Sequence, residues 1–177
     1  MDTLKYPIGT PNIPNDVSTE LINTWIQIIE EFPAKLTTLV EELSEEQLDT
    51  PYRTDGWTIR QVIHHCADSH HNSYTRFKWT LTEDKPVIKA YFEDRWAELI
   101  DYKAPIILSL NHLTALHAKW VYFLQRLSKD DLVKVFIHPE GNEEVSLKEN
   151  IGIYAWHCQH HYAHIEQLML RKNWIEG

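Results

Sequence analysis

Four long segments of this chain carry the signals of α-helices. In residues 17–43 and 105–127 the apolar side chains recur every three or four positions, which is the period of one helix face. Two further segments open on capping boxes, Thr58-Ile59-Arg60-Gln61 and Ser146-Leu147-Lys148-Glu149, which predict helices to about residues 81 and 172. The 177 residues include only five glycines, which argues against a loop-rich α/β design. We therefore predict an all-α protein built as a four-helix bundle.

The segments between these helices add smaller features. Pro33 lies inside the first predicted helix and predicts a kink or break there. After the third helix the apolar period changes to two over residues 133–137, and the turn signal Pro139-Glu140-Gly141-Asn142 follows. This pattern predicts a small β-hairpin inserted before the last helix. We expect residues 1–177 to form a single domain.

The overall composition excludes several classes of function. The formal net charge is −9 and no basic stripe is present, so nucleic acid and anionic membranes are poor partners. Two cysteines do not make a disulfide framework. No signal peptide and no apolar run of about 18–20 residues is visible, so we expect no membrane span. These features predict a cytoplasmic protein that acts on a small-molecule substrate.

Eight of the eleven histidines fall in two clusters, residues 64–71 and 156–164. In the second cluster, His160 and His164 are four positions apart, so on a helix they lie about 40° apart on one face. His157 and His161 flank the same sector. An imidazole pair of this kind, with a third histidine from a facing helix, predicts a metal site that keeps one coordination position open. The alternative is a solvated histidine face with no metal.

In the first cluster, spacing alone does not separate His64 from His65 as the third ligand. His64 shares its helix face with Asp68, which suggests a surface pair or an acceptor that orients an imidazole. We favour His65 because it lies on a polar stripe that suggests a lined cavity. That stripe also contains Gln61, Ser69, Asn72 and Arg76.

Roles for the neighbouring residues are more open. Asn72 and Arg76 are candidates for gripping a substrate, and Arg76 suits an anionic group. Asp68 and His161 are candidates for orienting a ligand or relaying a proton. The cysteines, Cys66 and Cys158, are more typical of small core residues than of metal ligands.

Three further histidines, His112, His117 and His138, stand alone in the sequence and suggest no role.

Several stretches of the chain together resemble the DinB-like superfamily, and within it the YfiT-type metal-dependent hydrolases. The resemblance covers nearly the whole chain, and its motifs are specific for the subgroup but much less so for a reaction. The stretches that carry it are Tyr6-Pro7-Ile8-Gly9, Gly56 through His65, Ala67 through His70, Asn72-Ser73-Tyr74, Arg76-Phe77-Lys78, Phe136 through Pro139, Trp156-His157, His160-His161 and Ala163-His164-Ile165.

The resemblance implies a four-helix bundle that holds one divalent ion per chain. By match to the motif the ligands would be His65, His160 and His164, in agreement with the helical-face argument. It also implies zinc as the first choice of ion and nickel as the second, and a cytoplasmic homodimer. Relatives in the wider superfamily include transferases that join a low-molecular-weight thiol, such as bacillithiol, to an electrophile.

Four functions therefore stay open at the level of the sequence. A three-histidine site that activates water would make the protein a metal-dependent hydrolase, which we take as the first hypothesis. The same open position could hold a thiolate and support S-transfer instead. A metal-binding stress-response protein without catalysis would share the ligands, and a bundle with incidental histidines would need no metal.

Overall fold

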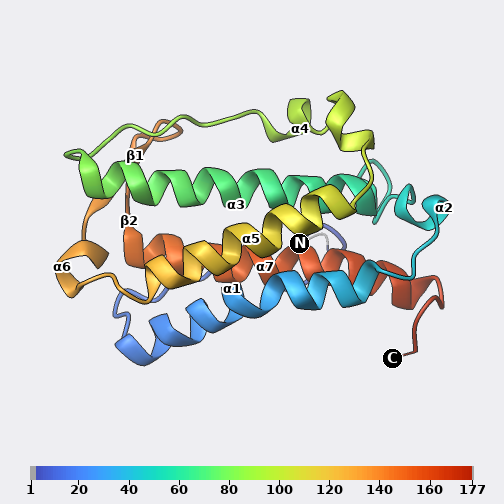
Figure 1. Ribbon diagram of the computed structural model, residues 1–177, viewed down its shortest axis with the longest axis horizontal. Coiled ribbons are helices and arrows are strands. Elements are labelled where there is room, and N and C mark those ends of the chain that lie inside the picture. The colour runs from blue at the N-terminus through green and yellow to red at the C-terminus, as the bar shows by residue number, and fades with distance from the viewer. Residues whose placement is uncertain (1–2, 177) are drawn as a thin grey trace.

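The computed structural model describes residues 3–176, and four long helices dominate it (Figure 1). α1 packs against α5 and α7, and α3 packs against the same two helices. This pairing puts α1 and α3 at opposite corners of the bundle, although they are the first two long helices in the chain. The four helices are α1 (Thr19–Val40), α3 (Ile59–Thr82), α5 (Ile107–Leu124) and α7 (Leu147–Arg171).

Short elements connect the long helices, and the two strands pair as the predicted hairpin. They are α2 (Glu45–Leu48), α4 (Glu93–Trp96), the 3₁₀ helix η1 (Ile100–Lys103), α6 (Lys129–Leu132), β1 (Val135–His138) and β2 (Glu143–Ser146). The structure confirms the all-α bundle and the hairpin before the last helix. Among the described residues, no helix combines the length and the apolar character that crossing a membrane requires.

The predicted capping boxes fix the starts of α3 and α7. The hydroxyl of Thr58 accepts from the backbone N–H of Gln61, and the Gln61 side chain accepts from the Thr58 N–H at 2.9 Å. Ser146 and Glu149 form the same reciprocal pair at α7. Each box satisfies two backbone N–H groups that a helix start otherwise leaves unpaired, so both helices begin where the sequence predicts.

Pro33, at which the sequence predicts a kink or a break, does not break the helix. α1 continues through it from Thr19 to Val40, and Pro33 itself is buried. A proline has no N–H, so the carbonyl of Ile29 has no donor one helical turn later. This carbonyl nevertheless accepts a hydrogen bond, from Nδ1 of His117 on α5 at 2.6 Å. A side chain from another helix therefore replaces the backbone donor that the proline removes.

The hairpin anchors the long segment that follows α3. β1 and β2 are antiparallel, with Val135 opposite Ser146 and His138 opposite Glu143. The segment after α3 runs beside β1, where the Ile88 N–H donates to the carbonyl of Ile137 at 3.0 Å. The residues that follow Ile88 are thereby held beside the face where α3 meets α7.

Candidate metal centre

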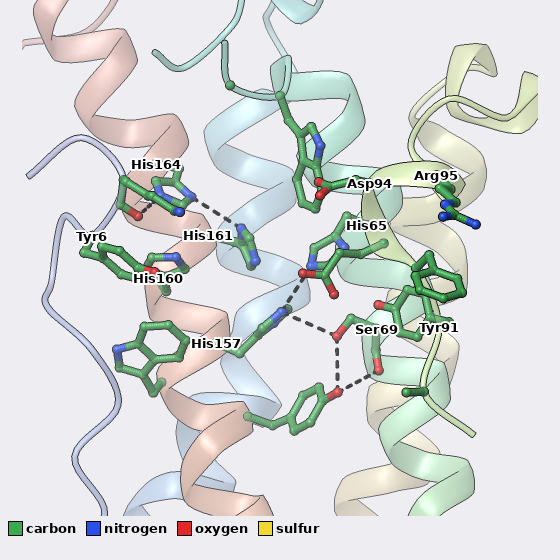
Figure 2. Close-up of a pocket in the computed structure, with 18 of the residues that line it drawn as sticks. Tyr6, His65, Ser69, Tyr91, Asp94, Arg95, His157, His160, His161 and His164 are labelled. Atoms are coloured by element: carbon green, nitrogen blue, oxygen red, sulfur yellow. Dashed lines mark hydrogen bonds between the residues drawn. The ribbon is translucent and has the colours of Figure 1, made fainter. Parts of the chain in front are cut away.

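A cavity of about 1150 Å³ opens between α3, α7, the N-terminal arm and the segment after α3 (Figure 2). Hydroxyl groups and charged side chains of both signs line its walls, among them Ser69, Tyr91, Arg76 and Glu93. Five imidazole rings also reach it. They belong to His65, His157, His160, His161 and His164. Of the polar stripe of α3, His65, Ser69 and Arg76 line the cavity, whereas Gln61 and Asn72 do not.

Three of these histidines converge across the bundle. One ring nitrogen each of His65 on α3 and of His157 and His161 on α7 lie within 4.8 Å of one another. Nε2 of His65 lies 3.3 Å from Nε2 of His157. Figure 2 shows the two α7 rings facing the α3 ring, with Ser69 one turn along α3 from His65.

One separation within this trio matches that of two ligands on a tetrahedral ion. Zinc binds imidazole nitrogen at about 2.0–2.1 Å, so two ligands at tetrahedral corners have nitrogens about 3.3 Å apart. The His65–His157 separation has this value. Nδ1 of His65 is also buried without a hydrogen-bond partner, which leaves the ring incompletely satisfied. The donor set and its spacing therefore suit a divalent ion of the zinc type.

The other two histidines of α7 turn toward the N-terminal arm. The ring of His160 stacks on Trp156 at 4.3 Å and lies 6.0 Å from Tyr6. The ring of His164 stacks on Tyr52 at 4.0 Å, and its Nε2 donates to the carbonyl of Lys5 at 3.0 Å. The two rings lie next to each other, 4.2 Å between centroids.

Burial keeps these imidazoles neutral. It lowers the pKa of His65 to about 3 and those of His160 and His164 to about 4, and the neighbouring rings add to the effect at His65 and His160. Burial likewise holds the pKa values of His157 and His161 well below the ordinary histidine value. Neutral imidazole is the form that binds metal, so the site is electrostatically prepared for a cation at neutral pH.

The structure separates His64 from His65. His64 points to the other side of α3, where its ring nitrogens lie 2.7 Å from Oγ of Ser109 and 3.1 Å from the carbonyl of Ala104. Asp68 accepts a hydrogen bond from the hydroxyl of Tyr102 at 2.8 Å, and burial raises the pKa of its carboxyl. Neither His64 nor Asp68 lines the cavity.

The two residues predicted to grip substrate lie in different places. Arg76 lines the cavity, and its Nε is buried without a hydrogen-bond partner. Asn72 is absent from the lining, and its side-chain amide donates to the carbonyl of Asp68 at 2.9 Å. Cys66 and Cys158 are buried free thiols whose pKa values burial raises, as expected of core cysteines.

Two buried histidines outside the cavity wall join its polar network. His70 of α3 contacts Nδ1 of His157 through its Nε2 at 3.0 Å, and His117 of α5 through its Nδ1 at 2.7 Å. No sequence pattern singles out His117, because its partners come from two other helices. The pairing of His157 with His161 was visible as a second i,i+4 spacing beside that of His160 with His164.

Comparison with known proteins connects this site to a family. Residues 28–165 match the profile of the DinB superfamily. A protein of Bacillus cereus strain 03BB102 named "Putative metal-dependent hydrolase" is 52% identical over 174 residues, which cover 98% of this chain and 100% of the relative. A protein of the same name from Bacillus anthracis strain CDC 684 is 51% identical over the same shares.

A solved structure agrees along nearly the whole chain. YfiT from Bacillus subtilis, described as "a probable metal-dependent hydrolase with an unusual four-helix bundle topology", superposes with a TM-score of 0.95 at 46% identity. The match covers 98% of this chain and 99% of that one. The four-helix arrangement described above, with α1 and α3 at opposite corners, therefore belongs to a fold that is also known from a solved structure. This protein belongs to the DinB superfamily.

Proposed function

We propose that this protein is a divalent-metal-dependent hydrolase whose ion is held by His65, His157 and His161. The observation that carries the proposal is the convergence of three neutral imidazoles within 4.8 Å on the wall of a cavity large enough for a small molecule. Three neutral nitrogen ligands leave a +2 ion with a position for water. Zinc is the expected ion, with nickel second.

The ligand set predicted from the sequence, His65 with His160 and His164, shares its first member with this one. We favour His157 and His161 because their nitrogens lie nearer to His65 and because Nε2 of His164 already donates to the Lys5 carbonyl. Either pair has the i,i+4 spacing that brings two rings to one face of α7. The choice between the pairs is therefore a prediction that the variants below test.

A bound divalent ion supplies Lewis acidity and lowers the pKa of a water to about 7. The chain supplies the remaining parts. Uncharged imidazoles leave the positive charge of the site uncompensated, which favours an anionic nucleophile. Ser69 Oγ lies 3.4 Å from Nε2 of His157, so it can hydrogen-bond beside the reacting atoms. The guanidinium of Arg76 can bind an anionic part of the substrate along the same wall.

The decisive experiment begins with metal content. The protein purified without chelator should contain one equivalent of ion by mass spectrometry, and His65→Ala should abolish it. Loss in His157→Ala and His161→Ala, with retention in His160→Ala, supports the proposed ligand pair, and the reverse pattern supports the sequence-based pair. His71→Ala is the matched control, because His71 is exposed on α3 and pairs with His112 away from the cavity.

The reaction is tested on the same preparations. The loaded protein should hydrolyse activated esters or amides without added thiol, and the activity should disappear in His65→Ala. Turnover that requires a bacillithiol-like thiol and an electrophile would replace hydrolysis by S-transfer. Absence of a stoichiometric ion in the wild-type protein would overturn the proposal altogether.

A further inference from the structure

Two deeply buried histidines belong to a continuous line of hydrogen-bonded groups that ends at the candidate metal centre. It runs from the Ile29 carbonyl to His117 at 2.6 Å, then to His70 at 2.7 Å and to His157 at 3.0 Å. The side chains of His70 and His117 are 0% and 1% exposed, and neither lines the cavity. Four helices contribute one member each, since the carbonyl belongs to α1 and the three rings to α5, α3 and α7.

The donor and the acceptor of the first hydrogen bond in the line are fixed, and they set its direction. Pro33 has no N–H, so the Ile29 carbonyl has no helical donor and is open to His117. A carbonyl oxygen only accepts hydrogen bonds. Nδ1 of His117 therefore carries the hydrogen, and in a neutral ring its Nε2 is left as an acceptor.

The donor and acceptor nitrogens of the next two rings follow from this first bond. Among the described residues, no ion pair or hydrogen bond joins these rings to a carboxylate, and a charged imidazole buried without a partner would be costly. With His117 Nε2 as acceptor, the donor must be Nδ1–H of His70. By the same step, Nε2 of His70 accepts from Nδ1–H of His157. The Nε2 of His157 is left as an acceptor, and its lone pair faces Nε2 of His65 at 3.3 Å and Oγ of Ser69 at 3.4 Å.

We propose that His117 and His70 are positioning residues that lock His157 in the tautomer whose Nε2 lone pair faces the metal centre. Metal ligands of this type are oriented by an acceptor on their other ring nitrogen. Here that acceptor is itself a histidine, His70. The order of donors and acceptors starts at the Ile29 carbonyl, which has no helical donor because Pro33 has no N–H. The role of the lone pair in metal binding rests on the proposed function, whereas the tautomer itself does not.

The tautomer can be read directly in metal-free wild-type protein. Imidazole nitrogens labelled with ¹⁵N show by NMR which of the two carries the hydrogen. We expect Nδ1–H at His157, His70 and His117. An Nε2–H form of His157 in the folded wild-type protein would overturn the inference, and this measurement requires no variant to fold.

The positioning role is tested by two substitutions at one site. In His117→Phe the ring volume stays but the acceptor for His70 disappears, so a share of His157 should shift to the Nε2–H form. Zinc affinity, measured by competition with a chelator, should fall about 10- to 100-fold. In His117→Gln the amide can donate to the Ile29 carbonyl and accept from His70, so tautomer and affinity should stay near wild type.

His112→Gln serves as the control, because His112 lies on α5 and pairs only with the exposed His71 among the described residues. A folded His117→Phe protein with unchanged His157 tautomer and unchanged zinc affinity would overturn the positioning role. If wild-type protein binds no zinc, the proposed function fails instead, and the NMR result still decides the direction of the line.

Discussion

At the scale of single residues, the cavity combines neutral imidazole rings with two guanidinium groups, those of Arg53 and Arg76, whose buried Nε atoms lack a hydrogen-bond partner. Arg76 lies on the wall of the cavity, and its Nε is buried without an acceptor. A buried N–H without an acceptor in a binding cavity indicates that a ligand supplies one. Together with the positive charge, this indicates that the substrate has an anionic or strongly polar group away from the reacting bond.

Arg76→Met should therefore raise KM for an ester with a distal carboxylate about tenfold or more, with a smaller effect on a neutral ester of similar size. The expected loss corresponds to one hydrogen bond to a charged group, about 1.5 kcal/mol or more. Steady-state kinetics on the two esters measures it. Arg95→Met is the matched control, since Arg95 lies on the same cavity but stacks on Phe92 at 4.3 Å. An equal rise in KM for both esters in Arg76→Met would contradict the assignment.

At the scale of secondary-structure elements, α1 and α7 approach so closely that a helical glycine becomes a packing requirement. A Cβ on Gly152 of α7 would lie 2.7 Å from Cδ1 of Ile13 and 2.9 Å from Cη2 of Trp25. The Ile13 methyl group can move, but the indole ring of Trp25 is rigid and packed against the core. The close contact fixes how α7 is rotated, and hence which of its histidines face α3.

Gly152→Ala should lower the free energy of unfolding by about 1 kcal/mol or more. Overpacking costs about 1–3 kcal/mol and outweighs the gain of up to about 1 kcal/mol in helix propensity. Urea unfolding followed by circular dichroism measures the change. Gln159→Ala, at an exposed position of the same helix, should stay within about 0.5 kcal/mol of wild type. A Gly152→Ala protein more stable than wild type would show that the contact relaxes freely.

Local signals account for what the sequence predicts about the elements. The starts of α3 and α7 follow from capping boxes, which act within four residues, and the hairpin follows from its turn residues and its period of two. The choice of a ligand pair on α7, made from the sequence as His160 and His164, has no such local signal and stays a prediction. His157 with His161 and His160 with His164 have identical spacing, and only the rotation of α7 in the bundle distinguishes them.

Pro33 also shows that local sequence signals do not reveal contacts between helices that are distant in the chain. The sequence predicts a kink or break in α1 at this residue, but the partner that satisfies the freed carbonyl, His117, lies 88 positions away in the chain.

At the scale of the whole molecule, the bundle encloses an unusual amount of neutral histidine. Each buried ring adds a dependence of stability on pH, because the unfolded chain exposes it to water and lets it protonate.

The assembly of several chains is a separate matter. The homodimer and the cytoplasmic location implied by the resemblance stay predictions, and light scattering on the eluted protein tests the first of them.

His117 gives the pH dependence its clearest test, because it lies outside the cavity. Burial lowers its pKa to about 4, against about 6.5 in the unfolded chain. Between these values the unfolded state binds the extra proton, so its contribution to stability is complete above about pH 7 and is lost as the pH falls from 6.5 toward 4. For one such ring the loss between pH 7.5 and 5.5 is about 1.3 kcal/mol.

Urea unfolding of metal-free protein at pH 7.5 and 5.5 should therefore show a loss of at least this size, to which the other buried histidines add in the same direction. In His117→Gln the loss should be smaller by about 1.3 kcal/mol, since the amide does not titrate. If His117→Gln and wild type lose the same free energy between the two pH values, burial does not lower the pKa of His117. The ring would then be protonated at pH 5.5 in the folded protein, and at that pH its Nε2 could not accept a hydrogen bond from His70.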